Sequence, residues 1–137
     1  MTRINIVPVN ELMDQHLVAE YREIFMVGAA LQRSLNSKNR FNETRIPDTY
    51  TLNKGHVMFF YNKGLYLKNR YDELISEMKS RNMNPDPARV FPKEKFPLTF
   101  YNDWTPVTDD FTIIRERIEY RISQRPDWYR YKGRKLS

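Results

Sequence analysis

The chain has 137 residues and a formal net charge of +6; 40% of the residues are hydrophobic, 14% are aromatic and none is cysteine. This length suits one domain, and the lack of cysteine excludes disulfides, thiolate nucleophiles and cysteine-bound zinc. The positive charge predicts a polyanionic partner. No apolar run reaches the length of a membrane span, and the N-terminus lacks the layout of a secretory signal, so we expect no membrane association.

The first predicted helix runs from about residue 11 to about residue 35. Its apolar positions recur at spacings of three and four, as expected for one face of a helix: Leu17, Tyr21, Ile24, Gly28, Leu31 and Leu35. We expect Asn10 or Asp14 to cap its start. The polar residues 37–42 are expected to end it.

The next segment, residues 43–63, contains Pro47 and Gly55, which indicate irregular structure. Its short apolar run, residues 57–61, is compatible with a strand or with a buried extended segment. We favour the extended segment because no partner strand is evident. A second helix is predicted over residues 63–81, and its apolar face carries Leu67, Tyr71, Leu74 and Met78.

Five prolines between residues 85 and 106 argue against regular structure in that stretch. A third helix is predicted to start near Thr108, where Asp109 and Asp110 suit the positive end of the helix dipole. Its apolar face carries Phe111, Ile114, Ile118 and Ile122. These elements predict an all-α fold: a compact single domain over residues 1–137, with three main helices and long irregular connections.

The C-terminal tail, residues 125–137, holds five basic residues and one acid. Aromatic and basic side chains alternate in it: Trp128, Tyr129, Arg130, Tyr131 and Lys132. Basic groups bind phosphates and aromatic rings stack on bases, so we favour a nucleic-acid contact. The alternative is a basic tail whose aromatic residues pack on the core.

Two features near the N-terminus suggest chemistry. Glu23 lies beside the apolar face of the first helix; it is either half of a solvent-exposed pair with Arg22 or a carboxylate in a site. Met1 before a small residue is normally removed, which would leave the α-amine of Thr2 free. Such an amine has a pKa of about 7.7–8.0, so its neutral form can attack carbon electrophiles and form a Schiff base. A nearby cation such as Arg3 would lower that pKa further.

Arg117 and Arg121 lie one turn apart on the third helix, so they share a face. They either extend a phosphate-binding surface or pair with Glu116 or Glu119. Only two histidines are present, forty residues apart, and no metal-ligand spacing is visible.

Five stretches resemble the bacteriophage pyrimidine-dimer DNA glycosylase/AP lyase family, known as the UV-repair endonuclease V family. They occur in the family's order: MTRIN (1–5), DQHL.AEYRE (14–23), GHV.FFY.K (55–63), ELI.E (73–77) and QRP.WY (124–129). The resemblance therefore covers essentially the whole chain. It implies a three-helix fold whose N-terminal segment is threaded between the helices.

The resemblance also implies a mechanism. The Thr2 amine would attack C1′ of the 5′ nucleotide of a cyclobutane pyrimidine dimer, an imine would form, and β-elimination would nick the strand. Glu23 would be the essential carboxylate. Further residues implied at the site or the DNA surface are Arg3, Gln15, His16, Arg22, Arg117 and Arg121. With the tail residues Trp128, Tyr129, Arg130 and Tyr131, these are the expected functional residues.

The implied partner is double-stranded DNA that contains UV lesions or abasic sites, bound by a monomer in the cytoplasm of an infected bacterial host cell. No metal or organic cofactor is implied, and deformation of the duplex contributes to recognition. Met26 stands where the family has a basic residue, and Arg121 where lysine is familiar. Two alternatives remain open: the same scaffold with another lesion specificity, and a nucleic-acid-binding protein without catalysis.

Overall fold

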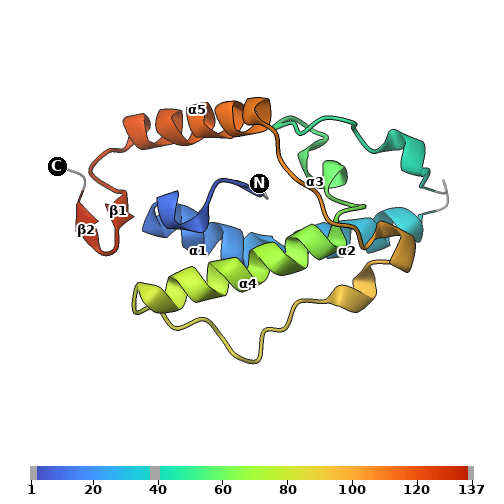
Figure 1. The fold of residues 1–137 in the computed structure, drawn as a ribbon, viewed down its shortest axis with the longest axis horizontal. Coiled ribbons are helices and arrows are strands. Elements are labelled where there is room, and N and C mark those ends of the chain that lie inside the picture. The colour runs from blue at the N-terminus through green and yellow to red at the C-terminus, as the bar shows by residue number, and fades with distance from the viewer. Residues whose placement is uncertain (1–2, 38–40, 136–137) are drawn as a thin grey trace.

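A computed structural model of the chain describes residues 3–37 and 41–135 (Figure 1). Within these ranges the long helices are α1 (Asp14–Glu23), α2 (Phe25–Leu35), α4 (Gly64–Ser80) and α5 (Thr108–Gln124). The short elements are η1 (Val9–Glu11), η2 (Glu43–Arg45), α3 (His56–Phe59), η3 (Lys93–Lys95), η4 (Leu98–Phe100), β1 (Arg130–Tyr131) and β2 (Arg134–Lys135). The predicted all-α architecture is confirmed, with α1–α2, α4 and α5 as its three main helical segments.

The first predicted helix is divided at Ile24 into α1 and α2. Neither predicted residue caps its start, because Met13 occupies the cap position and no side chain bonds there. The Asp14 carboxylate instead accepts hydrogen bonds from Arg81 and from two backbone N–H groups of the C-terminal segment. The cap prediction is therefore wrong because tertiary contacts hold the carboxylate.

The prediction of an extended segment at residues 57–61 is also wrong. The structure forms one helical turn there, α3, and buries His56, Phe59 and Phe60. Phe59 and Phe60 follow His56 by three and four positions, so in a helix all three side chains lie on one side. In an extended chain they would be divided between two faces. Burial of all three in the core therefore favours the helical turn.

The other two predicted helices are confirmed, at α4 and α5. The buried face of α4 includes the predicted Leu67, Tyr71, Leu74 and Met78. In α5, Ile114 is buried, and the Asp110 carboxylate accepts a hydrogen bond from the backbone N–H of Val107 at 3.0 Å. No helix within residues 3–37 and 41–135 has both the length and the apolar character needed to cross a membrane.

The C-terminal segment, predicted as a tail, ends in a small antiparallel hairpin in which Arg130 pairs with Lys135 and Tyr131 with Arg134. Lys132 and Gly133 form its turn with φ of 52° and 81°. Two positive φ values match the tight turns that join twisted antiparallel strands. Asp14 at the start of α1 accepts the turn's N–H groups, so the hairpin is attached to the helical body.

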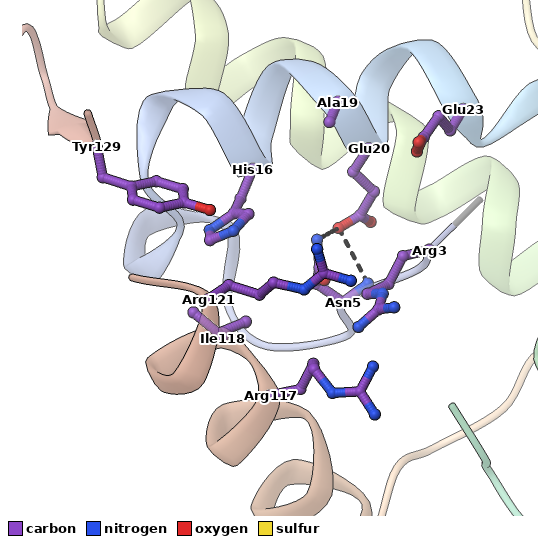
Figure 2. Close-up of a pocket in the computed structure, with 10 residues that line it drawn as sticks. All are labelled: Arg3, Asn5, His16, Ala19, Glu20, Glu23, Arg117, Ile118, Arg121 and Tyr129. Atoms are coloured by element: carbon purple, nitrogen blue, oxygen red, sulfur yellow. Dashed lines mark hydrogen bonds between the residues drawn. The ribbon is translucent and has the colours of Figure 1, made fainter. Parts of the chain in front are cut away.

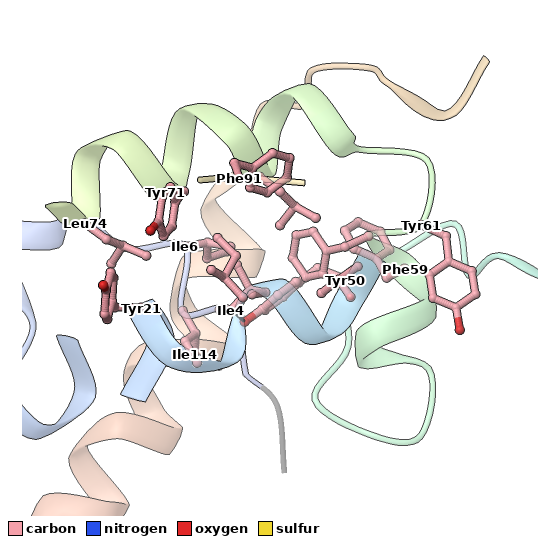
Figure 3. Packing of buried hydrophobic residues seen from close by; sticks show 14 of the residues in the cluster. Ile4, Ile6, Tyr21, Tyr50, Phe59, Tyr61, Tyr71, Leu74, Phe91 and Ile114 are labelled. Atoms are coloured by element: carbon pink, nitrogen blue, oxygen red, sulfur yellow. Dashed lines mark hydrogen bonds between the residues drawn. The ribbon is translucent and has the colours of Figure 1, made fainter. Parts of the chain in front are cut away.

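The N-terminal segment passes between α1 and α5 (Figure 1). Ile4 and Ile6 are buried in the aromatic and aliphatic core with Tyr50, Phe59 and Ile114 (Figure 3). The expected threading of this segment between helices is confirmed. Its burial places residues 4–7 inside the molecule, between the helices.

Candidate active site

A cleft of about 220 Å³ lies between α1, α5 and the N-terminal segment (Figure 2). Four parts of the chain supply its walls: the N-terminal segment, α1, α5 and the C-terminal segment. The lining residues are Arg3, Asn5, His16, Ala19, Glu20, Glu23, Arg117, Ile118, Arg121 and Tyr129. The cleft thus combines two carboxylates, one imidazole and three guanidinium groups.

Glu23 is the last residue of α1 and projects into this cleft from the helix end (Figure 2). Burial raises the pKa of its carboxyl group, and the positive charge of Arg3 acts in the opposite direction. A carboxyl group with a raised pKa is better matched to proton transfer near neutral pH. The helix end therefore presents a carboxylate that can stabilise a cation or accept a proton.

Three arginines line the same cleft: Arg3 from the N-terminal segment, and Arg117 and Arg121 from α5. Burial lowers the pKa of Arg3, and the charges of Arg117 and Arg121 lower it further. Among the described residues no carboxylate forms an ion pair with any of the three, including the neighbouring acids on α5. Converging cations that lack a protein partner can bind the oxygens of a phosphate.

A buried ion pair anchors the N-terminal segment beside the cleft. Glu20, which is 1% exposed, accepts hydrogen bonds from Arg70 Nε at 2.6 Å and Nη2 at 3.1 Å. The same carboxylate accepts from the backbone N and side-chain Nδ2 of Asn5, at 3.1 and 3.0 Å. Arg70 also donates to the carbonyl of Val7 at 2.5 Å. One carboxylate and one guanidinium therefore hold both sides of a bend in the segment.

The bend is centred on Ile6, whose φ of 51° is rare for a β-branched residue. The N–H of Val7 donates to the carbonyl of Asn5 across this turn at 2.5 Å. Such a conformation persists where surrounding contacts enforce it. Here the contacts of Glu20 and Arg70 to the flanking residues supply that constraint.

His56 provides a second anchor for the N-terminal segment. Neither Glu20 nor His56 was among the functional residues expected from the sequence. Its Nε2 accepts the backbone N–H of Ile4 at 2.8 Å, so its Nδ1 carries the proton and donates to the carbonyl of Thr51 at 2.8 Å. Burial lowers the pKa of this imidazole. The hydroxyl of Tyr50 donates to the carbonyl of Ile4 at 2.9 Å. A neutral histidine thus fixes the backbone directly after Arg3.

His16 lies at the opposite end of the cleft, with its ring 4.8 Å from that of Tyr129 (Figure 2). Burial lowers the pKa of His16 to about 4, and the charges of Arg3 and Arg121 contribute. Its Nδ1 is buried and has no hydrogen-bond partner among the described residues. A neutral imidazole therefore forms this wall at pH 7.

The two histidines are expected to make the protein less stable as the pH falls below about 6.5. In the unfolded chain they take up protons near that pH, whereas His16 stays neutral in the folded protein down to about 4. The free energy of unfolding should fall between pH 6.5 and 4, and the His16→Gln variant should show a shallower fall. Urea unfolding across this range tests this expectation; identical slopes for the two proteins would contradict it.

Gln15 does not itself line the cleft; it binds the segment that carries Tyr129. Its Nε2 donates to the carbonyl of Trp128 at 2.6 Å, and its Oε1 accepts the N–H of Arg130 at 3.0 Å. The amide therefore holds the C-terminal segment against α1. This contact places Tyr129, between those two residues, in the cleft wall.

The remaining predicted residues that the structure describes lie outside the cleft lining. Arg22 is exposed on α1, and Trp128 is 46% exposed with the guanidinium of Arg125 4.5 Å from its ring. Arg130 donates to the carbonyl of Asp127 at 2.6 Å. Thr2 lies outside the described residues.

Tyr131 donates from its hydroxyl to the carbonyl of Asn10, and its ring lies 4.7 Å from the Arg81 guanidinium. Tyr129 is buried. The alternative prediction, in which aromatic residues of the tail pack on the core, therefore holds for Tyr129 and Tyr131. Trp128 is the aromatic residue of this segment that stays open to solvent.

Among the described residues, no three histidine, aspartate or glutamate side chains come together to hold a metal ion.

Comparison with protein families matches residues 1–90 of the chain to the family described as pyrimidine dimer DNA glycosylase. The matched range contains Arg3 and Glu23 of the cleft. It also contains Glu20, His56 and Arg70, which anchor the N-terminal segment. Helix α5 and the C-terminal hairpin follow the matched range.

Proposed function

The chain belongs to the pyrimidine dimer DNA glycosylase family, and we propose that it excises the 5′ base of a cyclobutane pyrimidine dimer and then nicks the strand as an AP lyase. The observation that supports this proposal most is the cleft. There a carboxylate with a raised pKa and three arginines without described partners meet at an anchored N-terminal segment. Double-stranded DNA with UV lesions or abasic sites is the proposed substrate.

The proposed nucleophile is the α-amine of Thr2, set free by removal of Met1. Thr2 is joined directly to Arg3, whose side chain lines the cleft. The amine nitrogen bonds to C1′ of the damaged nucleotide as the bond from C1′ to the base breaks. The bonding electrons leave with the base, which takes up a proton. Opening of the sugar ring then gives an imine between protein and DNA.

The second proposed step is β-elimination at this imine. A proton leaves C2′, the bond between C3′ and its phosphate oxygen breaks, and the strand is nicked on the 3′ side. The Glu23 carboxylate stabilises the positive charge at the sugar and moves protons between the reacting atoms. The imine itself accepts the electron pair, so the step needs no metal or organic cofactor.

The proposed DNA contacts surround this chemistry. Arg3, Arg117 and Arg121 would bind phosphates next to the lesion, because they converge without an ion-pair partner in the described chain. Arg22, Trp128 and Arg130 are open or partly open to solvent and would contact the duplex further out. We further propose that residues 1–137 form one domain, because Gln15 and Asp14 attach the C-terminal segment to α1.

Borohydride trapping tests the proposal. Protein that intact mass shows to begin at Thr2 is incubated with duplex DNA holding one thymine dimer or one abasic site, and then reduced. We expect a covalent adduct that maps to the N-terminal peptide, and none with undamaged duplex. A Thr2→Gln variant that retains Met1 is the matched control and should form no adduct.

The outcomes separate the alternatives. Protein that begins at Thr2 and binds DNA without forming an adduct would overturn the lyase proposal and favour a binding protein. An adduct with abasic DNA but no cleavage of dimer DNA would retain the lyase step and assign another lesion to the glycosylase step.

A further inference from the structure

The junction between α1 and α2 directly follows the proposed catalytic carboxylate. Helix α1 ends at Glu23, Ile24 interrupts the helical run, and α2 begins at Phe25. The last carbonyl groups of a helix need donors other than the following turn of the same helix. The direction of Glu23 therefore depends on what holds this end of α1.

Arg89 binds this helix end from the irregular connection after α4. Its Nη1 donates to the carbonyl of Tyr21 at 2.7 Å, and its Nη2 donates to the carbonyl of Arg22 at 2.9 Å. These are the two residues before Glu23. A fixed guanidinium fork suits two successive carbonyl groups, and its positive charge is favourable at a helix C-terminus.

The same guanidinium contacts both sides of the junction. Its Cζ lies 4.6 Å from the ring centroid of Tyr21 on α1 and 4.0 Å from that of Phe25 on α2. Such cation–π contacts are attractive. Arg89 is thus bonded to the helix before the interruption and packed on the ring after it, so it limits the angle between α1 and α2.

The backbone that carries Arg89 is itself held in place. The hydroxyl of Tyr71 on α4 donates to the Arg89 carbonyl at 2.8 Å, and the Arg89 N–H donates to the carbonyl of Asp86 at 3.1 Å. The N–H of Asp86 in turn donates to the Tyr21 hydroxyl at 2.9 Å. The guanidinium is therefore presented from a fixed loop on the side of α1 that packs against α4.

We propose that Arg89 is a positioning residue that holds the last turn of α1 so that the Glu23 carboxylate points into the cleft. This inference rests on the proposed function for its effect on catalysis. Its structural part, the orientation of Glu23, does not depend on what the protein cleaves. A misplacement of a reacting group by about 1 Å lowers a rate by roughly 100-fold.

Two substitutions and one control test the proposal. Arg89→Met removes the charge and both hydrogen bonds, whereas Arg89→Lys keeps the charge but cannot bridge two carbonyls with a planar fork. Lys93→Met removes an exposed charge from the same connection and is the matched control. At saturating protein, we expect the single-turnover rate of dimer cleavage to fall roughly 10- to 100-fold for Arg89→Met and less for Arg89→Lys. DNA affinity should change no more than in the control.

A second measurement needs no activity. The ¹³C resonance of the Glu23 carboxyl group is titrated by NMR in the wild-type protein and in the three variants. Burial raises the pKa of Glu23, so a loosened helix end should lower that pKa towards the ordinary value in both Arg89 variants and leave it unchanged in Lys93→Met. Arg89→Lys is chosen to remain folded, and circular dichroism checks this.

The results distinguish this inference from the proposed function. An unchanged Glu23 titration in folded Arg89→Lys, or a cleavage rate for Arg89→Met equal to that of Lys93→Met, would overturn the role of Arg89. A wild-type protein that does not cleave would overturn the proposed function. In that case the NMR titration still decides whether Arg89 orients Glu23.

Discussion

Glu23→Gln is expected to lower the rate of dimer excision and strand cleavage by about 10²–10⁴-fold. The glutamine is close in size to glutamate but has no negative charge to stabilise the sugar cation and cannot accept a proton from it. DNA affinity should be unchanged or higher, because the substitution removes a negative charge from a cleft that otherwise presents three arginines. Single-turnover cleavage and equilibrium binding to dimer-containing duplex measure the two effects.

Glu94→Gln is the matched control for this substitution. Glu94 is exposed in η3 and does not line the cleft, so its variant should cleave at the wild-type rate. Undiminished cleavage by Glu23→Gln would remove Glu23 from the proposed mechanism. A parallel loss of cleavage and binding would assign it to DNA recognition.

Arg70→Met is expected to destabilise the protein by about 3–5 kcal/mol, because it leaves a charged carboxylate buried without its cation. Glu20 is 1% exposed, and Arg70 supplies two of its hydrogen bonds. The carbonyl of Val7 also loses its donor. Urea unfolding measures the loss. The fraction of Arg70→Met that remains folded should cleave dimer-containing DNA slowly, because the N-terminal segment loses an anchor.

Arg115→Met controls for the loss of an ion pair as such. Arg115 pairs with Glu11 on the surface at 2.8 Å, and both side chains are nearly half exposed. Removal of such a pair should cost about 1 kcal/mol or less. Equal losses for Arg70→Met and Arg115→Met would show that the buried pair does not stabilise the fold in the way inferred.

Apolar periodicity predicted α4 and α5 correctly because the apolar residues of each helix recur at helical spacing along the sequence. This side is buried in α4 and partly buried in α5, where Ile114 is fully buried. The same reasoning failed at residues 57–61. A five-residue apolar run is compatible with a strand, an extended segment or one helical turn. Only the burial of His56, Phe59 and Phe60 in the core favours the helical turn. It also missed the interruption at Ile24, where Arg89 binds the helix end from a distant connection.

Sequence reasoning selected Glu23 and the arginines because their residue types and motif positions are visible along the chain. It missed Glu20 as an anchor, since nothing local distinguishes a buried acid from an exposed one. Arg70 offsets the cost of burying the charge of Glu20, and it lies fifty positions away in the sequence. Gln15 was expected near the site, and only the structure shows that its bonds to Trp128 and Arg130 hold the C-terminal segment against α1.

The sequence by itself determined the helical class, the basic charge, and the residues that carry the family resemblance. All of these depend on residue type and on spacings of a few positions. Only the tertiary structure decided which groups meet. It brings Arg3, Glu23 and Arg121 to one cleft from three parts of the chain, and it attaches the hairpin to Asp14 across more than a hundred residues. Such contacts leave no local pattern, because they form only when distant elements pack on a shared core.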